Sequence, residues 1–142
     1  MKFDMAVVDA TLIIGLAHLR LTDKVFRVFD VVYVSQAVVR ETKLRGRQRR
    51  RRDVVRFAKW VNICTKWDEA LFQARMVVLQ QRQPKKKHRG EAESIAQAVR
   101  QRIPVFLTDD EDAAHEAFQH GIRVISLMEL FRLIASEETE TD

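Results

Sequence analysis

Five carboxylates lie at the ends of predicted strands, on the helix that follows a strand, or at the start of a predicted helix. They are Asp9, Glu41, Glu91, Glu93 and Asp110. In a parallel sheet the carboxyl ends of the strands meet at one edge, and ligands bind beyond that edge. Four separate segments of the chain can therefore bring carboxylates to one place.

Carboxylates that are held close together repel one another, and a bound divalent cation relieves this repulsion. Mg²⁺ and Mn²⁺ prefer oxygen ligands, and the sequence contains no Cys and His cluster of the kind that binds zinc. The alternative role for these acids is structural, because aspartate caps helices well and Asp9 directly precedes a predicted helix. Capping alone would not require these acids to gather at one edge of the sheet, so the set as a whole favours a metal site.

Strands must alternate with helices for these acids to share an edge, and the apolar pattern predicts this order. Buried, β-branched runs predict strands at 1–9, 31–34, 61–65, 105–107 and 122–125. Helical periodicity and capping residues predict helices at 10–20, 22–29, 36–44, 91–102, 111–120 and 126–135, with others near 54–60 and from 68 onward. The predicted fold is a three-layer α/β/α domain with a parallel sheet of four to five strands.

The chain length of 142 residues suits one domain with a full core. We assign 1–135 to this domain and expect the acidic residues 136–142 to form a disordered tail. No apolar run approaches the roughly 20 residues of a membrane span, and the chain does not begin with a signal-peptide pattern. Together with the single cysteine, Cys64, these features predict a cytoplasmic protein without a membrane partner.

Basic residues are concentrated in two segments of the chain. The first segment contains Lys43, Arg45, Arg47, Arg49, Arg50, Arg51 and Arg52. The second contains Lys85, Lys86, Lys87 and Arg89. A run of charges is usually a solvated helix face, but this density of bases with few acids favours contact with the phosphates of a nucleic acid.

Four short segments carry most of these acids. In chain order they are Val-Val-Asp-Ala-Thr at 7–11, Val-Val-Arg-Glu at 38–41, Gly-Glu-Ala-Glu-Ser-Ile-Ala-Gln-Ala at 90–98 and Leu-Thr-Asp-Asp-Glu-Asp at 107–112. Together and in this order they resemble the motifs of the PIN-domain ribonucleases, and 121–125 is similar to the closing strand of that family. The segment 46–89 matches no motif of the family.

The resemblance implies a ribonuclease that cleaves single-stranded RNA with the help of Mg²⁺ or Mn²⁺. The residues at the ligand positions of the motifs are Asp9, Glu41, Glu91 or Glu93, and Asp110. Thr108 would then hydrogen-bond to a carboxylate, and Asp109 and Asp112 would hold the ligands in place. Within this family we expect a VapC-like toxin or a related PIN-domain nuclease. The expected partners are RNA, a protein antitoxin and a second copy of the chain in a homodimer.

Two questions stay open at this point. Glu91 and Glu93 flank the apolar face of the helix 91–102 on opposite sides, each about 100° from its centre, so periodicity does not choose between them. A position at the helix start favours Glu91 as the ligand, while Glu93 is also placed to act as a capping carboxylate. The alternative function is a nucleic-acid-binding module with a PIN-like fold that does not cut RNA, and only the nuclease requires Asp9 and Asp110 as carboxylates.

Overall fold

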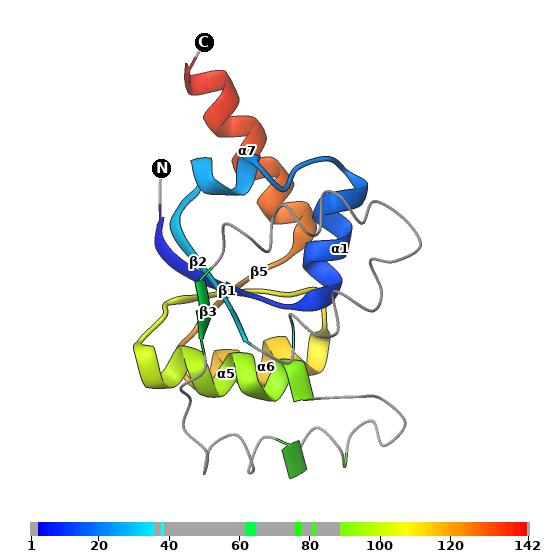
Figure 1. Ribbon diagram of the computed structural model, residues 1–142, viewed down its shortest axis with the longest axis vertical. Coiled ribbons are helices and arrows are strands. Elements are labelled where there is room, and N and C mark those ends of the chain that lie inside the picture. Colours follow the sequence, from blue (N-terminus) through cyan, green and yellow to red (C-terminus); the bar gives the residue numbers. More distant parts are fainter. Residues whose placement is uncertain are drawn as a thin grey trace.

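A parallel five-stranded sheet lies at the centre of the protein in a computed structural model that describes residues 3–35, 38, 62–64, 76, 77, 81 and 89–141 (Figure 1). The strands are β1 (Phe3–Val8), β2 (Phe29–Ser35), β3 (Asn62–Cys64), β4 (Val105–Leu107) and β5 (Arg123–Ile125). Their spatial order is β3-β2-β1-β4-β5, so β1 is the central strand. The register pairs Val7 with Tyr33 of β2 and Val8 with Leu107 of β4.

Helices cover both faces of the sheet. They are α1 (Ala10–His18), α5 (Arg89–Gln101), α6 (Glu111–Gln119) and α7 (Leu127–Thr141), with a short 3-10 helix, η1 (Lys24–Arg27), before β2. Figure 1 shows α1, η1 and α7 on one side of the sheet and α5 and α6 on the other. The predicted three-layer α/β/α fold is therefore confirmed, with five parallel strands.

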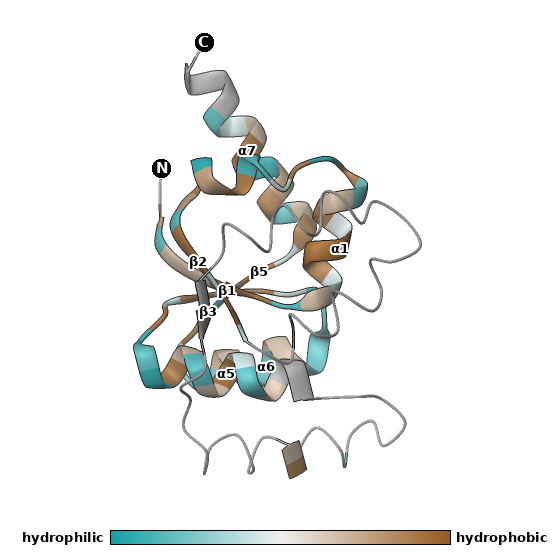
Figure 2. Ribbon diagram, in the orientation of Figure 1, coloured by the Kyte–Doolittle hydropathy of each residue, from teal (hydrophilic) through white to brown (hydrophobic). Residues whose placement is uncertain are grey.

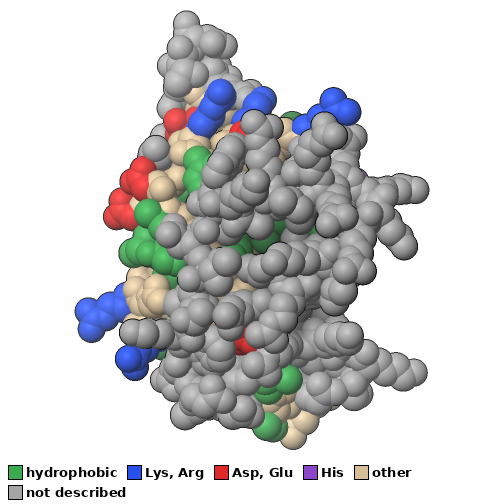
Figure 3. Space-filling model, viewed as in Figure 1, with side chains coloured by type: hydrophobic (Ala, Val, Ile, Leu, Met, Phe, Trp, Pro, Cys, Tyr) green, Lys and Arg blue, Asp and Glu red, His purple; other side chains and the backbone are tan. Residues whose placement is uncertain are grey.

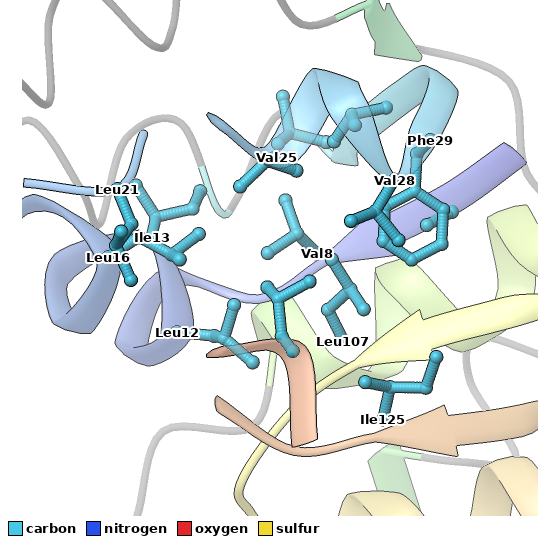
Figure 4. Close-up of a cluster of buried hydrophobic side chains, with 14 of the residues drawn as sticks. Val8, Leu12, Ile13, Leu16, Leu21, Val25, Val28, Phe29, Leu107 and Ile125 are labelled. Atoms are coloured by element: carbon cyan, nitrogen blue, oxygen red, sulfur yellow. The ribbon is translucent and has the colours of Figure 1, made fainter. Parts of the chain in front are cut away.

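The residues at 6–8 of β1 are all apolar because successive side chains point into the cores on opposite faces of the sheet. Ala6 and Val8 are fully buried in the core cluster that includes α1 and α7 (Figure 4). Val7 points the other way, into the cluster that α5 and α6 form with Phe106. Both faces of the strand are buried, which is the expected pattern for a parallel sheet covered by helices. Figure 2 shows the hydrophobic strands at the centre and hydrophilic residues along the helices.

Two predicted element boundaries are wrong. The helix predicted at 22–29 is only the single turn η1, because Phe29 belongs to β2, pairs with Phe3 and stacks on its ring with the centroids 5.4 Å apart. The disordered tail predicted from 136 is also wrong, since α7 continues to Thr141. No Gly or Pro follows Ser126, and glutamate is a good helix former, so no residue ends the helix earlier.

Much of the middle of the chain lies outside the described residues. This part includes most of the helix predicted at 36–44 and those predicted near 54–60 and from 68 onward. The short strand predicted at 61–65 is present as β3, beside β2. Among the described residues, no helix is long and apolar enough to cross a membrane.

Candidate functional site

The register between β1 and β4 brings two of the predicted site segments together. Val8 pairs with Leu107, so Asp9 and Thr108 follow at the carboxyl ends of neighbouring strands. The Asp9 amide donates a hydrogen bond of 3.2 Å to the Leu107 carbonyl, which extends the pairing beyond the strands. Two segments about a hundred positions apart in the chain therefore meet at one edge of the sheet, as the sequence predicts.

The Thr108 hydroxyl connects the two aspartates of this edge. It donates a hydrogen bond to Oδ2 of Asp9 and accepts one from the backbone N–H of Asp110 at 3.1 Å. Thr108 is 1% exposed and Asp9 is 5% exposed, so their contact is shielded from water. The predicted hydrogen bond from Thr108 to a carboxylate is present, and its acceptor is Asp9.

Both aspartates also cap helices. Oδ1 of Asp9 accepts from the Leu12 amide at 2.9 Å, at the start of α1. Oδ1 of Asp110 accepts from the Ala113 amide at 2.9 Å, at the start of α6. The unpaired N–H groups and the dipole at each helix start favour negative charge, so both carboxylates lie where an anion is stabilised.

Capping a helix and binding a cation are compatible roles for one carboxylate, which has about four acceptor positions. The oxygens of Asp9 and Asp110 are of the hard, anionic type that Mg²⁺ and Mn²⁺ bind, so these residues fit such an ion as part of its ligand set. Within the described part of the chain, no group of three or more His, Cys, Asp and Glu side chains is arranged to hold a metal. Glu41 is outside that part, and only the backbone of Glu91 is described.

The contacts of α5 bear on the choice between Glu91 and Glu93. Ile95 and Ala98 pack against the sheet and α6. Position 91 precedes them by four and seven residues, so it falls on their side of the helix. Glu93 is about 160° around the helix from Ile95 at the helical pitch, and its side chain is fully buried. This register favours position 91 for the site, and the choice stays a prediction.

The other predicted supporting acids lie close to the site in the chain. Asp109 is exposed, and its Oδ1 accepts a hydrogen bond of 2.9 Å from the Leu127 amide, the first residue of α7. Asp112 is half-buried in the first turn of α6. The Asp109 carboxylate thus hydrogen-bonds to the start of α7.

The two basic segments are not placed by the structure. Residues 43–52 and 85–87 lie outside the described residues, and only the backbone of Arg89 is described, as the first residue of α5. On the face seen in Figure 3, the described Lys and Arg side chains lie in separate places near its upper and left edges. The nucleic-acid-binding role of the basic segments stays a prediction.

Gln97 is an unusual residue that the sequence analysis did not identify. It lies on α5 one turn after Glu93 and is 1% exposed. Within the described part of the chain, neither its amide nitrogen nor its amide oxygen has a hydrogen-bond partner. At the helical pitch Gln97 lies away from the apolar positions of α5, so periodicity predicts an exposed side chain. The structure instead buries it, which leaves its amide without hydrogen-bond partners among the described residues.

Replacement of Gln97 by methionine, which has a similar size and no amide, is expected to stabilise the fold. An unpaired buried polar group costs about 1–3 kcal/mol, so the variant should unfold at a higher denaturant concentration than the wild type. Urea unfolding followed by circular dichroism measures this change. The matched control is Gln81→Met, where the side chain is exposed to solvent and little change is expected. A clear loss of stability in Gln97→Met would contradict the assignment of an unpaired amide.

Comparison with known proteins agrees with this architecture. A family model described as a PIN domain matches residues 5–139, which include the segment 46–89. The crystal structure of PAE2754 from Pyrobaculum aerophilum superposes with a TM-score of 0.63, covers 94% of this chain and 96% of that one, and is 14% identical in sequence. At that identity the likeness shows a shared fold. A search of curated proteins found no significant match. Because the family model covers nearly the whole chain, the protein belongs to the PIN-domain family and has its nuclease-type fold.

Proposed function

We propose that this protein is a metal-dependent ribonuclease that cleaves single-stranded RNA. The observation that carries the proposal is the linked pair of aspartates at the carboxyl edge of the sheet, joined through the Thr108 hydroxyl. The same edge is where ligands bind in open parallel sheets. Membership of a family with a nuclease-type fold supports the reaction class.

The residues that would hold Mg²⁺ or Mn²⁺ are Asp9, Asp110, Glu41, and Glu91 with Glu93 as its alternative. When bound, such an ion supplies a more acidic water and offsets the negative charge of the scissile phosphate. Thr108 fixes the orientation of the Asp9 carboxylate, because its hydroxyl is itself held by the Asp110 amide. The starts of α1 and α6 favour negative charge at both aspartates, which suits this edge to binding a cation.

RNA is the proposed substrate because of the two basic segments. The Lys and Arg residues at 43–52 and 85–89 are dense enough in positive charge to bind the phosphates of an RNA backbone. The basic residues 85–87 come shortly before α5, which begins at Arg89 and carries Glu91, so basic residues lie next to a predicted ligand in the sequence. The finer proposal, a toxin that is controlled by a protein antitoxin, rests on the likeness of the motifs to VapC-like toxins.

Removal of divalent metal is the direct test of this function. The purified protein should cleave a fluorogenic single-stranded RNA in the presence of Mn²⁺ or Mg²⁺, and excess EDTA should abolish cleavage. Added Mn²⁺ should then restore the rate, because the carboxylates alone do not acidify water. A double-stranded RNA of the same sequence is the control substrate and should be cut more slowly. RNA binding without any cleavage in either metal would instead support the alternative, a nucleic-acid-binding module that does not cut.

A further inference from the structure

Three consecutive side chains at the end of β4 hold three different parts of the fold. Thr108 bonds to Asp9 at the start of α1, and Asp110 caps α6. Asp109, between them, accepts a hydrogen bond of 2.9 Å from the Leu127 amide at the start of α7. The backbone of the same turn is held to β5, since the Thr108 amide donates to the Ile125 carbonyl at 3.1 Å.

The helix that Asp109 contacts is a firmly packed element. Leu130 and Ile134 of α7 are almost fully buried in the core cluster that contains Leu12 and Leu16 of α1. The first turn of α7 also lies close against α1, because a Cβ atom added to Gly15 would be 2.7 Å from Cδ2 of Leu127. The amide that Asp109 binds is therefore fixed relative to α1, the helix that Asp9 caps.

The start of α7 has a second cap that is independent of this turn. The Ser126 hydroxyl accepts a hydrogen bond of 3.1 Å from the Glu129 amide. Both Ser126 and Asp109 thus stabilise the beginning of α7, and a loss of either should weaken it. Only Asp109 is the chain neighbour of Thr108 and Asp110, so only its loss should also disturb these two residues.

We propose that Asp109 is a positioning residue for the metal-binding aspartates. Its hydrogen bond to α7 holds the turn 108–110 in place, so that the Thr108 hydroxyl reaches Asp9 and the Asp110 carboxylate keeps its position at the start of α6. This inference rests on the proposed function, since it assigns Asp9 and Asp110 to a divalent cation. It adds a structural connection from α7 to the site that the family membership does not supply.

The test compares Asp109→Ala with Ser126→Ala, and measures Mn²⁺ affinity by isothermal titration calorimetry at a temperature where both variants are folded. Loss of a residue that hydrogen-bonds a metal ligand typically weakens metal binding by about 10–100-fold. Because Asp109 acts through the turn that carries the ligands, we expect Asp109→Ala to fall at the lower end, about 10-fold. Ser126→Ala should lower the melting temperature by a similar amount and keep the Mn²⁺ Kd within about twofold of the wild type. Asp109→Asn retains an oxygen acceptor for the Leu127 amide and should recover most of the affinity.

RNA kinetics supply a second readout for the same variants. Asp109→Ala should lower kcat with little change in KM, because the residue positions the site and does not bind the substrate. Equal Mn²⁺ affinities in Asp109→Ala and Ser126→Ala would overturn this inference alone. A wild-type protein that binds no Mn²⁺ would overturn the proposed function, and the inference with it.

Discussion

Replacement of Asp9 by asparagine is expected to lower the rate of RNA cleavage by about a hundredfold or more, and Asp110→Asn should do the same. Asparagine keeps the side-chain oxygen that caps the Leu12 or Ala113 amide, so both helices should retain their starts. The negative charge is lost, and with it the attraction for a divalent cation at the reacting phosphate. The measurement is kcat/KM on a fluorogenic single-stranded RNA.

A matched control is available on the same strand. Asp4→Asn removes the same charge from an exposed position near the opposite end of β1, and it should cleave RNA at the wild-type rate. Mn²⁺ should also raise the melting temperature of the wild type, because a ligand that binds only the folded state stabilises it. The double variant Asp9→Asn with Asp110→Asn should lose this rise. A rise that persists in the double variant would place the metal elsewhere.

The second large effect is expected at position 91. Glu91→Gln should reduce cleavage by about a hundredfold or more, whereas Glu93→Gln should mainly change stability. The reason is the register of α5, in which position 91 lies on the side of Ile95 and Ala98 while Glu93 lies on another side and is buried. The measurement is cleavage rate together with melting temperature for each single variant. If Glu93→Gln is inactive and Glu91→Gln is merely less stable, the assignment is reversed.

Cleavage at the wild-type rate by both Glu91→Gln and Glu93→Gln would contradict a metal-binding role for this helix. Neither acid would then bind the metal, and the likeness of 90–98 to the third family motif would not extend to its function. Because both changes preserve the size of the side chain, a loss of rate at constant stability reports the charge itself.

The central strands could be predicted because they contain short apolar runs that are buried on both faces, at 6–8 in β1 and 105–107 in β4. The run 6–8 shows this most clearly, since Val7 and its two neighbours lie in different core clusters. The meeting of Asp9 with Thr108 and Asp110 followed from the parallel order, which brings strand ends to one edge. The sequence presented capping and metal binding as competing roles for Asp9, but the observed cap leaves room for both.

Other features depend on contacts between distant residues that no local pattern encodes. The partner of Asp109 is a backbone amide 18 positions away, which is determined by how α7 packs against α1. The burial of Gln97 likewise depends on what surrounds α5, because helical periodicity places the residue away from the apolar face. The tail was predicted as disordered from its charge, whereas α7 continues through it to Thr141.

Anomalous diffraction from crystals soaked in Mn²⁺ tests the central claim most directly, because it locates the metal without reference to activity. The account predicts a manganese peak within coordination distance, about 2.0–2.2 Å, of a carboxylate oxygen of Asp9 and one of Asp110, beside the Thr108 hydroxyl. The peak should be absent from crystals of the variant that carries both Asp9→Asn and Asp110→Asn. Manganese bound away from both aspartates, or no peak at a saturating concentration, would contradict a metal-dependent nuclease site at this edge of the sheet.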